Sequence, residues 1–504
     1  MNTPLRFSRL PDTVQVSIAS GRLAGQQESA IYVFRGIPYA APPVGHLRWR
    51  PPQPVKSWEG VRPALSVGPA PMQVLPSASS LMYRLNHDDR QPLVMSEDCL
   101  YLNVWSPDLS PTARLPVLVW IHGGGNATGH GGQALFNGHN LAARGIVVVT
   151  LNMRLGALGF LSHPALAQED DLGASGNYGL QDIAAALHWV QENIAVFGGD
   201  PSKVTLGGNS AGAASITHLM IAPVCRGLFR AAIAQSASGI FRPDGPMQSH
   251  DAAAKRGAER VATLGKTLTA LRELPATAFL TLPPQPVSVD GRLLIEDTQR
   301  CFLDGRQAVI PLLAGWNADE GSLYSLSGQV NHQGLDDWAR LEDCYRTLYD
   351  DHPAGFRRAL TSDTRFIYPV WRRATTHAHT SNAPVWLYEF NHRLPIPDDV
   401  PPPSDGGQDY GAFHTAELPY IWDNLAARPW AWREDDRLLA KRLADGWTRF
   451  VSHCDPRGVG LQTWAAISES VNFAAGVFGI NAQPGIAARQ AAFGLLDYLH
   501  SVNN

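Results

Sequence analysis

The distribution of apolar residues along the chain predicts a sheet of buried strands with helices between them. Residues 182–197 carry apolar side chains at near-helical spacing, and residues 211–221 are small and apolar enough to form a helix that lies against a sheet. Four short apolar runs have the length and composition of central strands: residues 115–122, 146–152, 204–206 and 310–315. This alternation predicts an α/β fold with a mostly parallel central sheet covered by helices on both faces.

Neither an internal repeat nor a low-complexity linker divides the chain, so we expect one domain that spans residues 1–504. The segment richest in proline and glycine, residues 395–407, lies shortly before a candidate functional histidine, His414. We interpret it as a loop at the functional site rather than as a domain boundary.

The composition is that of a globular protein, with 44% hydrophobic and 17% charged residues, which excludes a disordered or collagen-like chain. The formal net charge is −4, and the 41 basic and 45 acidic residues are interleaved. The sequence therefore shows no basic patch of the kind that would predict binding to a nucleic acid or to an anionic membrane. Chemistry on a small molecule is the function class that remains. The sequence leaves open whether the protein is a monomer or a homodimer.

The N-terminal segment, residues 1–21, has no uninterrupted apolar stretch of signal-peptide length, and no later stretch is long enough to span a bilayer. This predicts a cytoplasmic protein, although the mature form of a secreted protein would show the same pattern. The five cysteines are an odd number without a CxxC pair, so we expect free thiols. His377 and His379 would diverge on a helix, so we expect a solvated face there and no metal site.

Residues 208–212, with the sequence GNSAG, predict a nucleophilic serine at Ser210. They follow one predicted strand and precede a predicted helix, which is the context in which a GxSxG segment forms a sharp turn that exposes the serine hydroxyl. Such a turn leaves no room for side chains two residues before and after the serine, and Gly208 and Gly212 meet that need. A glycine/serine turn without chemistry is the alternative for the pentapeptide alone.

A second glycine-rich segment, residues 121–125 with the sequence IHGGG, follows another predicted strand. Attack on a carbonyl places negative charge on its oxygen, which needs preorganised N–H donors. Gly124, Gly125 and the helix-starting Ala211 therefore predict a three-donor oxyanion hole, in which each donor is worth roughly 3 kcal/mol of transition-state stabilisation. We expect His122 to orient this loop rather than to transfer protons.

With these segments the chain resembles the type B carboxylesterase family, which includes bacterial para-nitrobenzyl esterases and is related to the cholinesterases. The resemblance runs nearly from end to end and also covers residues 34–40 (FRGIPYA), 97–105 (EDCLYLNVW) and 197–201 (FGGDP). It implies an α/β-hydrolase fold with insertions that form an active-site gorge. It also implies a serine hydrolase that acts on small to medium carboxylic esters through an acyl-enzyme and needs no cofactor.

The resemblance selects the two partners of Ser210, which the residues alone leave open among 45 acids and 17 histidines. The segment NADEG at 317–321 matches the family's acid and places that role on Glu320 rather than on the aspartate before it. The segment AFHTAELP at 412–419 selects His414. The order serine, acid, histidine is the one expected of this fold.

Further positions that match or depart from the family bear on support and substrate range. Glu417 and Ser236 match positions that support the triad through hydrogen bonds. Asn209, which also belongs to this support, replaces the glutamate common before the nucleophile, so preference for cationic substrates should weaken. Asn126 replaces the aromatic residue that frequently follows the glycines, which should make that wall of the gorge more polar.

Pro71 stands where relatives with an early disulfide have its first cysteine, which leaves Cys99 unpaired and agrees with a reducing compartment. Residues 59–104 contain no tryptophan, so the aromatic platform on which cholinesterases bind a quaternary ammonium is not expected. Two alternatives stay open: a carbamate or amide hydrolase that uses the same residues, and a non-catalytic binding or adhesion module on the same fold. Modules of the latter kind usually lack the nucleophile.

Overall fold

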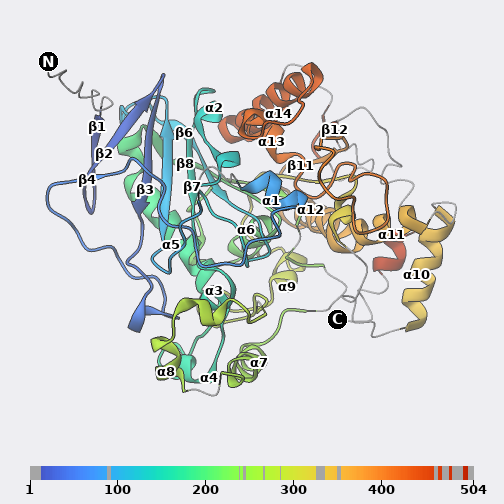
Figure 1. Cartoon of the computed structure of the whole chain (residues 1–504), viewed down its shortest axis with the longest axis horizontal. Coiled ribbons are helices and arrows are strands. Elements are labelled where there is room, and N and C mark those ends of the chain that lie inside the picture. The colour runs from blue at the N-terminus through green and yellow to red at the C-terminus, as the bar shows by residue number, and fades with distance from the viewer. Residues whose placement is uncertain are drawn as a thin grey trace, which may run out of the picture.

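In the described part of the chain, twelve strands form a single sheet that helices surround (Figure 1). The computed structural model describes residues 13–87, 92–237, 239–241, 246–264, 267–283, 285–324, 335–348, 353–458, 464–467, 476–478 and 492–497. The strands are β1 (Thr13–Ile18), β2 (Gly21–Glu28), β3 (Ile31–Pro38), β4 (Val61–Pro63), β5 (Tyr101–Ser106), β6 (Leu115–Ile121), β7 (Val147–Leu151), β8 (Gly199–Asn209), β9 (Ala231–Gln235), β10 (Leu312–Asn317), β11 (Val385–Phe390) and β12 (Gly476–Phe478). The helices are α1 (Leu81–Asn86), α2 (His139–Ala142), α3 (Gly156–Phe160), α4 (Pro164–Gln168), α5 (Tyr178–Asn193), α6 (Ala211–Leu219), α7 (His250–Ala262), α8 (Leu268–Glu273), α9 (Thr298–Leu303), α10 (Leu335–Leu348), α11 (Pro353–Ser362), α12 (Tyr368–Ser381), α13 (Leu418–Ile421) and α14 (Glu434–His453).

The sheet is parallel in its centre and antiparallel at its N-terminal edge. The strand order is β1-β2-β3-β5-β7-β6-β8-β9-β10-β11-β12, with β4 paired to β2 beside this path. Neighbours from β7 through β6 to β12 are parallel, whereas the pairs that join β1, β2, β3, β5 and β7 are antiparallel. The predicted α/β fold with a mostly parallel sheet is confirmed, and the antiparallel edge is a feature that the apolar runs did not predict.

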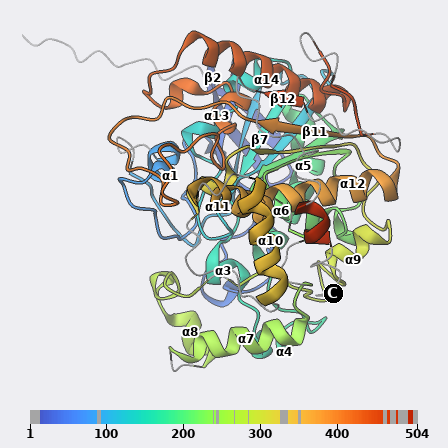
Figure 2. The same cartoon turned by 90° about the vertical axis from the view of Figure 1, so that its right-hand side faces the viewer.

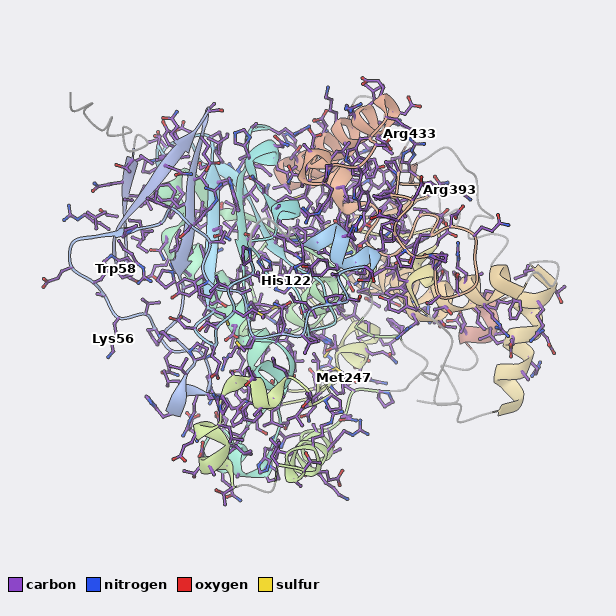
Figure 3. All side chains as sticks on the ribbon, in the orientation of Figure 1. Lys56, Trp58, His122, Met247, Arg393 and Arg433 are labelled. Atoms are coloured by element: carbon purple, nitrogen blue, oxygen red, sulfur yellow. The ribbon has the colours of Figure 1, made fainter. Side chains whose placement is uncertain are left out.

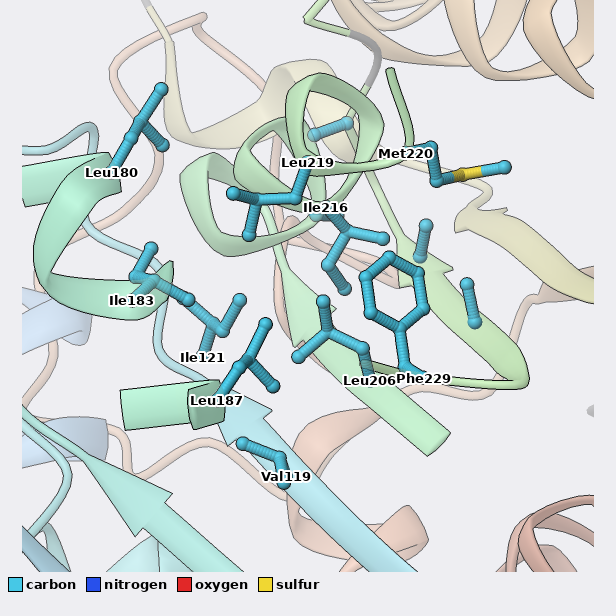
Figure 4. Close-up of a cluster of buried hydrophobic side chains, with 14 of the residues drawn as sticks. Val119, Ile121, Leu180, Ile183, Leu187, Leu206, Ile216, Leu219, Met220 and Phe229 are labelled. Carbon is cyan, nitrogen blue, oxygen red and sulfur yellow. The ribbon is translucent and has the colours of Figure 1, made fainter. Parts of the chain in front are cut away.

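The two faces of the sheet belong to two different hydrophobic cores. Alternate residues of β6 point to opposite faces, as the geometry of a strand requires. Val119 and Ile121 pack with the helices α5 and α6 on one face, which Figure 4 shows in close-up. Leu118 and Trp120 pack on the other face with residues of α13 and α14, which lie together above the sheet in Figures 1 and 2. A sheet buried on both faces explains why its central strands are continuous apolar runs.

The strand register brings together the residues that follow the central strands. Ile121 pairs with Gly208, and Asn209 pairs with Gln235, so β6, β8 and β9 end at the same level. In a parallel sheet the loops after these carboxyl ends form the crevice in which ligands bind. The register therefore places the glycine loop after β6 beside the turn that carries Ser210.

Other expectations from the sequence have mixed outcomes. All five cysteines are free, as expected. The solvated face expected for His377 is wrong, because its ring is fully buried and its nitrogens contact Gln307 and the carbonyl of Ile310. Among the residues described, no helix is both long and apolar enough to cross a membrane. The same residues hold no cluster of three or more histidine, cysteine or acidic side chains that could bind a metal ion.

Candidate active site

Ser210 occupies the sharp turn between β8 and α6. Its backbone angles are φ 54° and ψ −124°, a strained conformation for a residue with a side chain. Its amide donates to the carbonyl of Gln235 at 2.8 Å, which ties the turn to β9. The flanking glycines are sterically required, because a Cβ on Gly212 or Gly208 would lie 2.3 Å or 2.9 Å from the carbonyl oxygen of Ile121. The turn therefore presents the hydroxyl at the carboxyl edge of the sheet.

The glycine loop after β6 lies directly against Ser210. A Cβ on Gly123 would lie 3.1 Å from the Cβ of Ser210. Gly124 (φ 113°) and Gly125 (φ 64°) adopt backbone conformations that favour glycine. Neither of their amides donates to another residue in the described part of the chain, and Ala211 is the first residue of α6, where an amide has no partner within its own helix. The amides of Gly124, Gly125 and Ala211, which the sequence predicted as an oxyanion hole, thus have no hydrogen-bond partner among the described residues.

His122, which Figure 3 labels, is buried and contacts the glycine loop. Its Nδ1 donates to the carbonyl of Gly123 at 2.8 Å, and a Cβ on Gly129 would lie 2.4 Å from the same nitrogen. Burial lowers the pKa of His122 to about 4, so the ring is neutral at physiological pH. These contacts fit a residue that holds the loop in place.

The three residues predicted as a triad lie in contact with one another. His414 Nε2 lies 2.8 Å from Ser210 Oγ, and His414 Nδ1 lies 2.5 Å from Glu320 Oε2. The other oxygen of the fully buried Glu320 accepts the amide of Asn317 at 2.9 Å. The neighbouring Asp319 instead accepts the amide of Ala412 at 2.9 Å. Of the two adjacent acids, it is Glu320 that contacts the histidine.

Two aromatic rings that the sequence did not single out pack on the imidazole of His414. The ring of Phe366 lies 4.5 Å from it between centroids, at an interplanar angle of 33°, and that of Tyr324 lies 5.9 Å away. Phe366 belongs to a π-helical turn, Asp363–Ile367, that joins α11 to α12. Such turns are frequent at functional sites. No local signal in the sequence distinguishes this phenylalanine from others.

A second buried carboxylate, Glu417, lies below the triad. Its Oε1 accepts hydrogen bonds from Gln235 Nε2 at 2.9 Å and from Asn209 Nδ2 at 3.4 Å, and its Oε2 accepts from Asn317 Nδ2 at 2.6 Å. Burial is the main cause that raises the pKa of Glu417 to about 7, and the nearby charge of Glu320 raises it further. These three side-chain partners of the carboxyl are all neutral amides.

The structure places the other predicted supporting residues around this carboxylate. Asn209 is buried and directs its amide to Glu417, away from the open side of the turn. Among the described residues, the side chain of Ser236 contacts the network through Asn317, whose Nδ2 lies 3.5 Å from its Oγ. Gln235 and Asn317, which the sequence reasoning did not name as supporting residues, make closer contacts with Glu417 than Asn209 or Ser236 does.

Asn126 follows the glycines with φ 57°, and its carbonyl accepts the amide of Gly156 at 2.7 Å. Its side-chain Oδ1 is buried and has no hydrogen-bond partner among the described residues.

Pro71 and Cys99 line one small cavity, together with Arg48 and Glu97, which places the proline beside the unpaired thiol.

The comparisons with known proteins agree with this geometry. The model of the Carboxylesterase family matches residues 12–354 and 346–491. The chain belongs to the carboxylesterase family. It is therefore an ester hydrolase, and the resemblance, the fold and the general activity predicted from the sequence are confirmed.

Relatives of this carboxylesterase are similar over most of their length. Fumonisin B1 esterase of Sphingopyxis macrogoltabida is 36% identical over 463 residues, which cover 87% of this chain and 81% of the relative. Para-nitrobenzyl esterase of Bacillus subtilis is 36% identical over 484 residues, which cover 90% and 92%. Among solved structures, a carboxylesterase of Geobacillus stearothermophilus has a TM-score of 0.78 and 31% identity, and the match covers 95% of this chain and 99% of that one.

Proposed function

We propose that this carboxylesterase is a serine esterase in which Ser210 is the nucleophile, His414 the general base and acid, and Glu320 the group that orients His414. The observation that carries the proposal is the unbroken series of contacts from Glu320 Oε2 to His414 Nδ1 and from His414 Nε2 to Ser210 Oγ. A nucleophile, a base within hydrogen-bond reach and a third group that orients the base are the parts that acyl transfer requires.

The reaction follows from these positions. Ser210 Oγ attacks the carbonyl carbon of the ester while His414 Nε2 takes the hydroxyl proton. The amides of Gly124, Gly125 and Ala211 bind the oxygen that becomes negative. The C–O bond to the alcohol then breaks, the imidazolium protonates the leaving oxygen, and the acyl group stays on Ser210. Water attacks this acyl-enzyme through the same base and releases the carboxylic acid.

We assign supporting roles to Glu417, Asn209 and Ser236. Glu417 links the ends of β8 and β10, because its partner Asn209 precedes Ser210 at the end of β8 and its partner Asn317 ends β10, just before the turn that carries Glu320. A network of this kind fixes the relative positions of the two turns more firmly than separate hydrogen bonds would. Ser236 extends the network to the end of β9 through Asn317.

The substrates that we propose are small to medium carboxylic esters, with little preference for a cationic group because Asn209 is neutral. Hydrolysis of carbamates or amides by the same residues is the alternative, and kcat/KM on a matched ester, carbamate and anilide would distinguish them. A panel of esters that differ in acyl length, alcohol size and charge would define the range. Higher kcat/KM for cationic than for neutral esters of equal size would contradict the assignment for Asn209.

The decisive experiment on the mechanism compares two serines of the same region. Ser210→Ala should lose labelling by a fluorophosphonate probe, and kcat on a p-nitrophenyl ester should fall by ~10⁵-fold or more, because the nucleophile is removed. Ser202→Ala, at an exposed position of β8, should label and turn over like the wild type. Fluorophosphonate labelling that persists in Ser210→Ala would show that another residue is the nucleophile.

We also propose a reducing, cytoplasmic location, which the five free thiols support. Titration of the denatured protein with a thiol reagent, in the absence of reductant, should detect five free thiols per chain. A smaller count would indicate disulfides and an oxidising compartment.

A further inference from the structure

Arg358, on the helix α11, joins three segments that are far apart in the sequence. Its Nε and one terminal nitrogen donate to the two carboxylate oxygens of Asp405 at 2.6 Å and 3.1 Å. The same terminal nitrogen donates to the carbonyl of Asp409 at 2.8 Å. The other terminal nitrogen lies 3.6 Å from Asp319 Oδ1. The planar fork of one guanidinium is thus shared between the loop before His414 and the turn that carries Glu320.

The Asp319 contact leads directly to the catalytic pair. Asp319 precedes Glu320, and its backbone forms an isolated parallel bridge with Phe413, which precedes His414. The amide of Asp319 donates to the carbonyl of Ala412, and its Oδ2 accepts the amide of Ala412, both at 2.9 Å. The backbones of the acid turn and the histidine loop are therefore joined one residue before the side chains that meet at 2.5 Å.

Helix α11 also holds the acid turn from its other side. The amide of Gly321 donates to Ser362 Oγ at 2.8 Å, and that hydroxyl donates to the carbonyl of Arg358 at 2.8 Å. A Cβ on Gly321 would lie 2.4 Å from the same carbonyl oxygen. Figure 2 shows α11 beside α10 on the side of the molecule that faces the viewer. The helix and the residue after Glu320 are thus in direct contact.

The loop between β11 and His414, residues 391–411, contains neither helix nor strand. Loops of this length without secondary structure of their own are uncommon in compact domains and are frequently functional. Arg358 packs closely against the last part of this loop, since a Cβ on Gly407 would lie 2.1 Å from a guanidinium nitrogen. The amide of Gly407 also donates to Asp405 Oδ1, at 2.8 Å. The arginine therefore fixes the path of the chain shortly before the histidine.

Two other arginines contact this loop at more exposed positions. Arg84 pairs with Asp399, and Arg393 pairs with Asp409, with half or more of the surface of each aspartate side chain exposed. Within the described part of the chain, neither arginine contacts the acid turn. The side chain of Arg358, in contrast, is only 14% exposed and that of Asp405 4%. Exposed pairs contribute little to stability. Arg393 thus provides a matched control on the same loop, and Figure 3 labels it.

We propose that Arg358 is a positioning residue of the active site, which sets the contact between Glu320 and His414 by holding Asp319 and residues 405–409 in place. The inference rests on the proposed roles of Glu320 and His414. Among the described residues, the side chain of Arg358 contacts Asp405, Asp409 and Asp319 and none of the three triad residues. Its effect on the rate should nevertheless be large, because a displacement of about 1 Å in a catalytic group can cost on the order of 100-fold.

The test measures kcat for each active site, counted by complete labelling with a fluorophosphonate, at a temperature well below unfolding. Arg358→Gln should lower kcat on a small neutral ester by ~10- to 100-fold, with a much smaller change in KM. Arg358→Lys keeps the charge without the fork and should recover part of the loss. Arg393→Gln should match the wild type in kcat and in labelling.

A merely structural role predicts a different result. Arg358→Gln would then lower the melting temperature, or the fraction of sites that can be labelled. The kcat for each such site, measured on an unlabelled sample, would stay at the wild-type value, and this outcome would overturn the proposal. If Arg358→Gln does not fold, Asp405→Asn tests the paired hydrogen bonds between Arg358 and residue 405 while the contact of Arg358 with Asp319 stays in place. An unchanged kcat per site in this variant would also overturn the proposal. Failure of the proposed function would be seen separately, as activity that survives in Ser210→Ala.

Discussion

Replacing Glu417 by glutamine should change how the stability of the protein depends on pH. The carboxyl is buried, its three side-chain partners Asn209, Gln235 and Asn317 are neutral amides, and burial raises its pKa from 4.5 to about 7. Glutamine has the same shape and never ionises. The amide of Asn317 can turn over to receive the new NH₂ group, because its Oδ1 is buried without a partner among the described residues.

The sign of the effect follows from proton binding. Between pH 4.5 and about 7 the folded protein keeps a proton on Glu417 that the unfolded chain has released, so the free energy of unfolding falls as the pH rises through this window. The stabilisation from this group is complete below the unfolded pKa and is lost once the pH exceeds the folded one. A pKa difference from 4.5 to about 7, at about 1.36 kcal/mol for each pH unit, corresponds to about 3 kcal/mol.

The assay compares the unfolding of wild type and Glu417→Gln at about pH 5 and about pH 8. The variant should gain up to about 3 kcal/mol relative to the wild type between these two conditions, because only the wild type must ionise a buried group. Glu434→Gln, at an exposed position of α14, controls for the loss of one carboxylate. A stability difference between Glu417→Gln and the wild type that stays constant over this range would refute the reasoning.

Two further predictions concern the glycine loop. Gly124→Ala should lower kcat by ~100- to 1,000-fold, because a Cβ at φ 113° would lie 2.1 Å from the carbonyl oxygen of Thr128 and would displace an amide of the proposed oxyanion hole. Gly125→Ala, where a Cβ meets nothing within 4 Å, should lower kcat less. Equal kcat values for the two variants would contradict this. Asn126→Gly should raise the free energy of unfolding by about 1 kcal/mol, because glycine accepts φ 57° and the buried Oδ1 disappears. A lower melting temperature would show that the amide has a partner in solution.

Strands buried on both faces could be predicted from the sequence, and strands with an exposed face could not. Residues 115–122 were expected as a strand, and β6 ends at Ile121. The N-terminal strand β1 has one largely exposed face, so its alternating pattern gives a weaker signal. The sequence predicted this central strand only from residue 204, because Asp200 and Pro201 are residue types typical of a turn. Strand β8 in fact begins at Gly199, which pairs with Leu115 of β6.

Within the site, the residues that could be predicted from local sequence differ from those that depend on contacts between distant segments. Ser210 and the glycine loop lie in short segments whose residue types and context carry the chemistry. Glu320 and His414 meet across 94 residues, and only the family resemblance selected them. Phe366 and Arg358 reach the site only through tertiary contacts, with His414 and with Asp319 respectively, and neither has neighbours in the sequence that distinguish it from other residues of its type.

The parallel pairing of β6 with β8 gives a criterion for correct refolding of this protein. Ile121 lies opposite Gly208, and this register alone brings the glycine loop against Ser210. A slip by one residue would shift the loop by about 3.3 Å along the strand and would exchange the residues that face the two cores. Recovered esterase activity therefore reports that this central pair has formed in register, which recovery of secondary structure measured by circular dichroism cannot show.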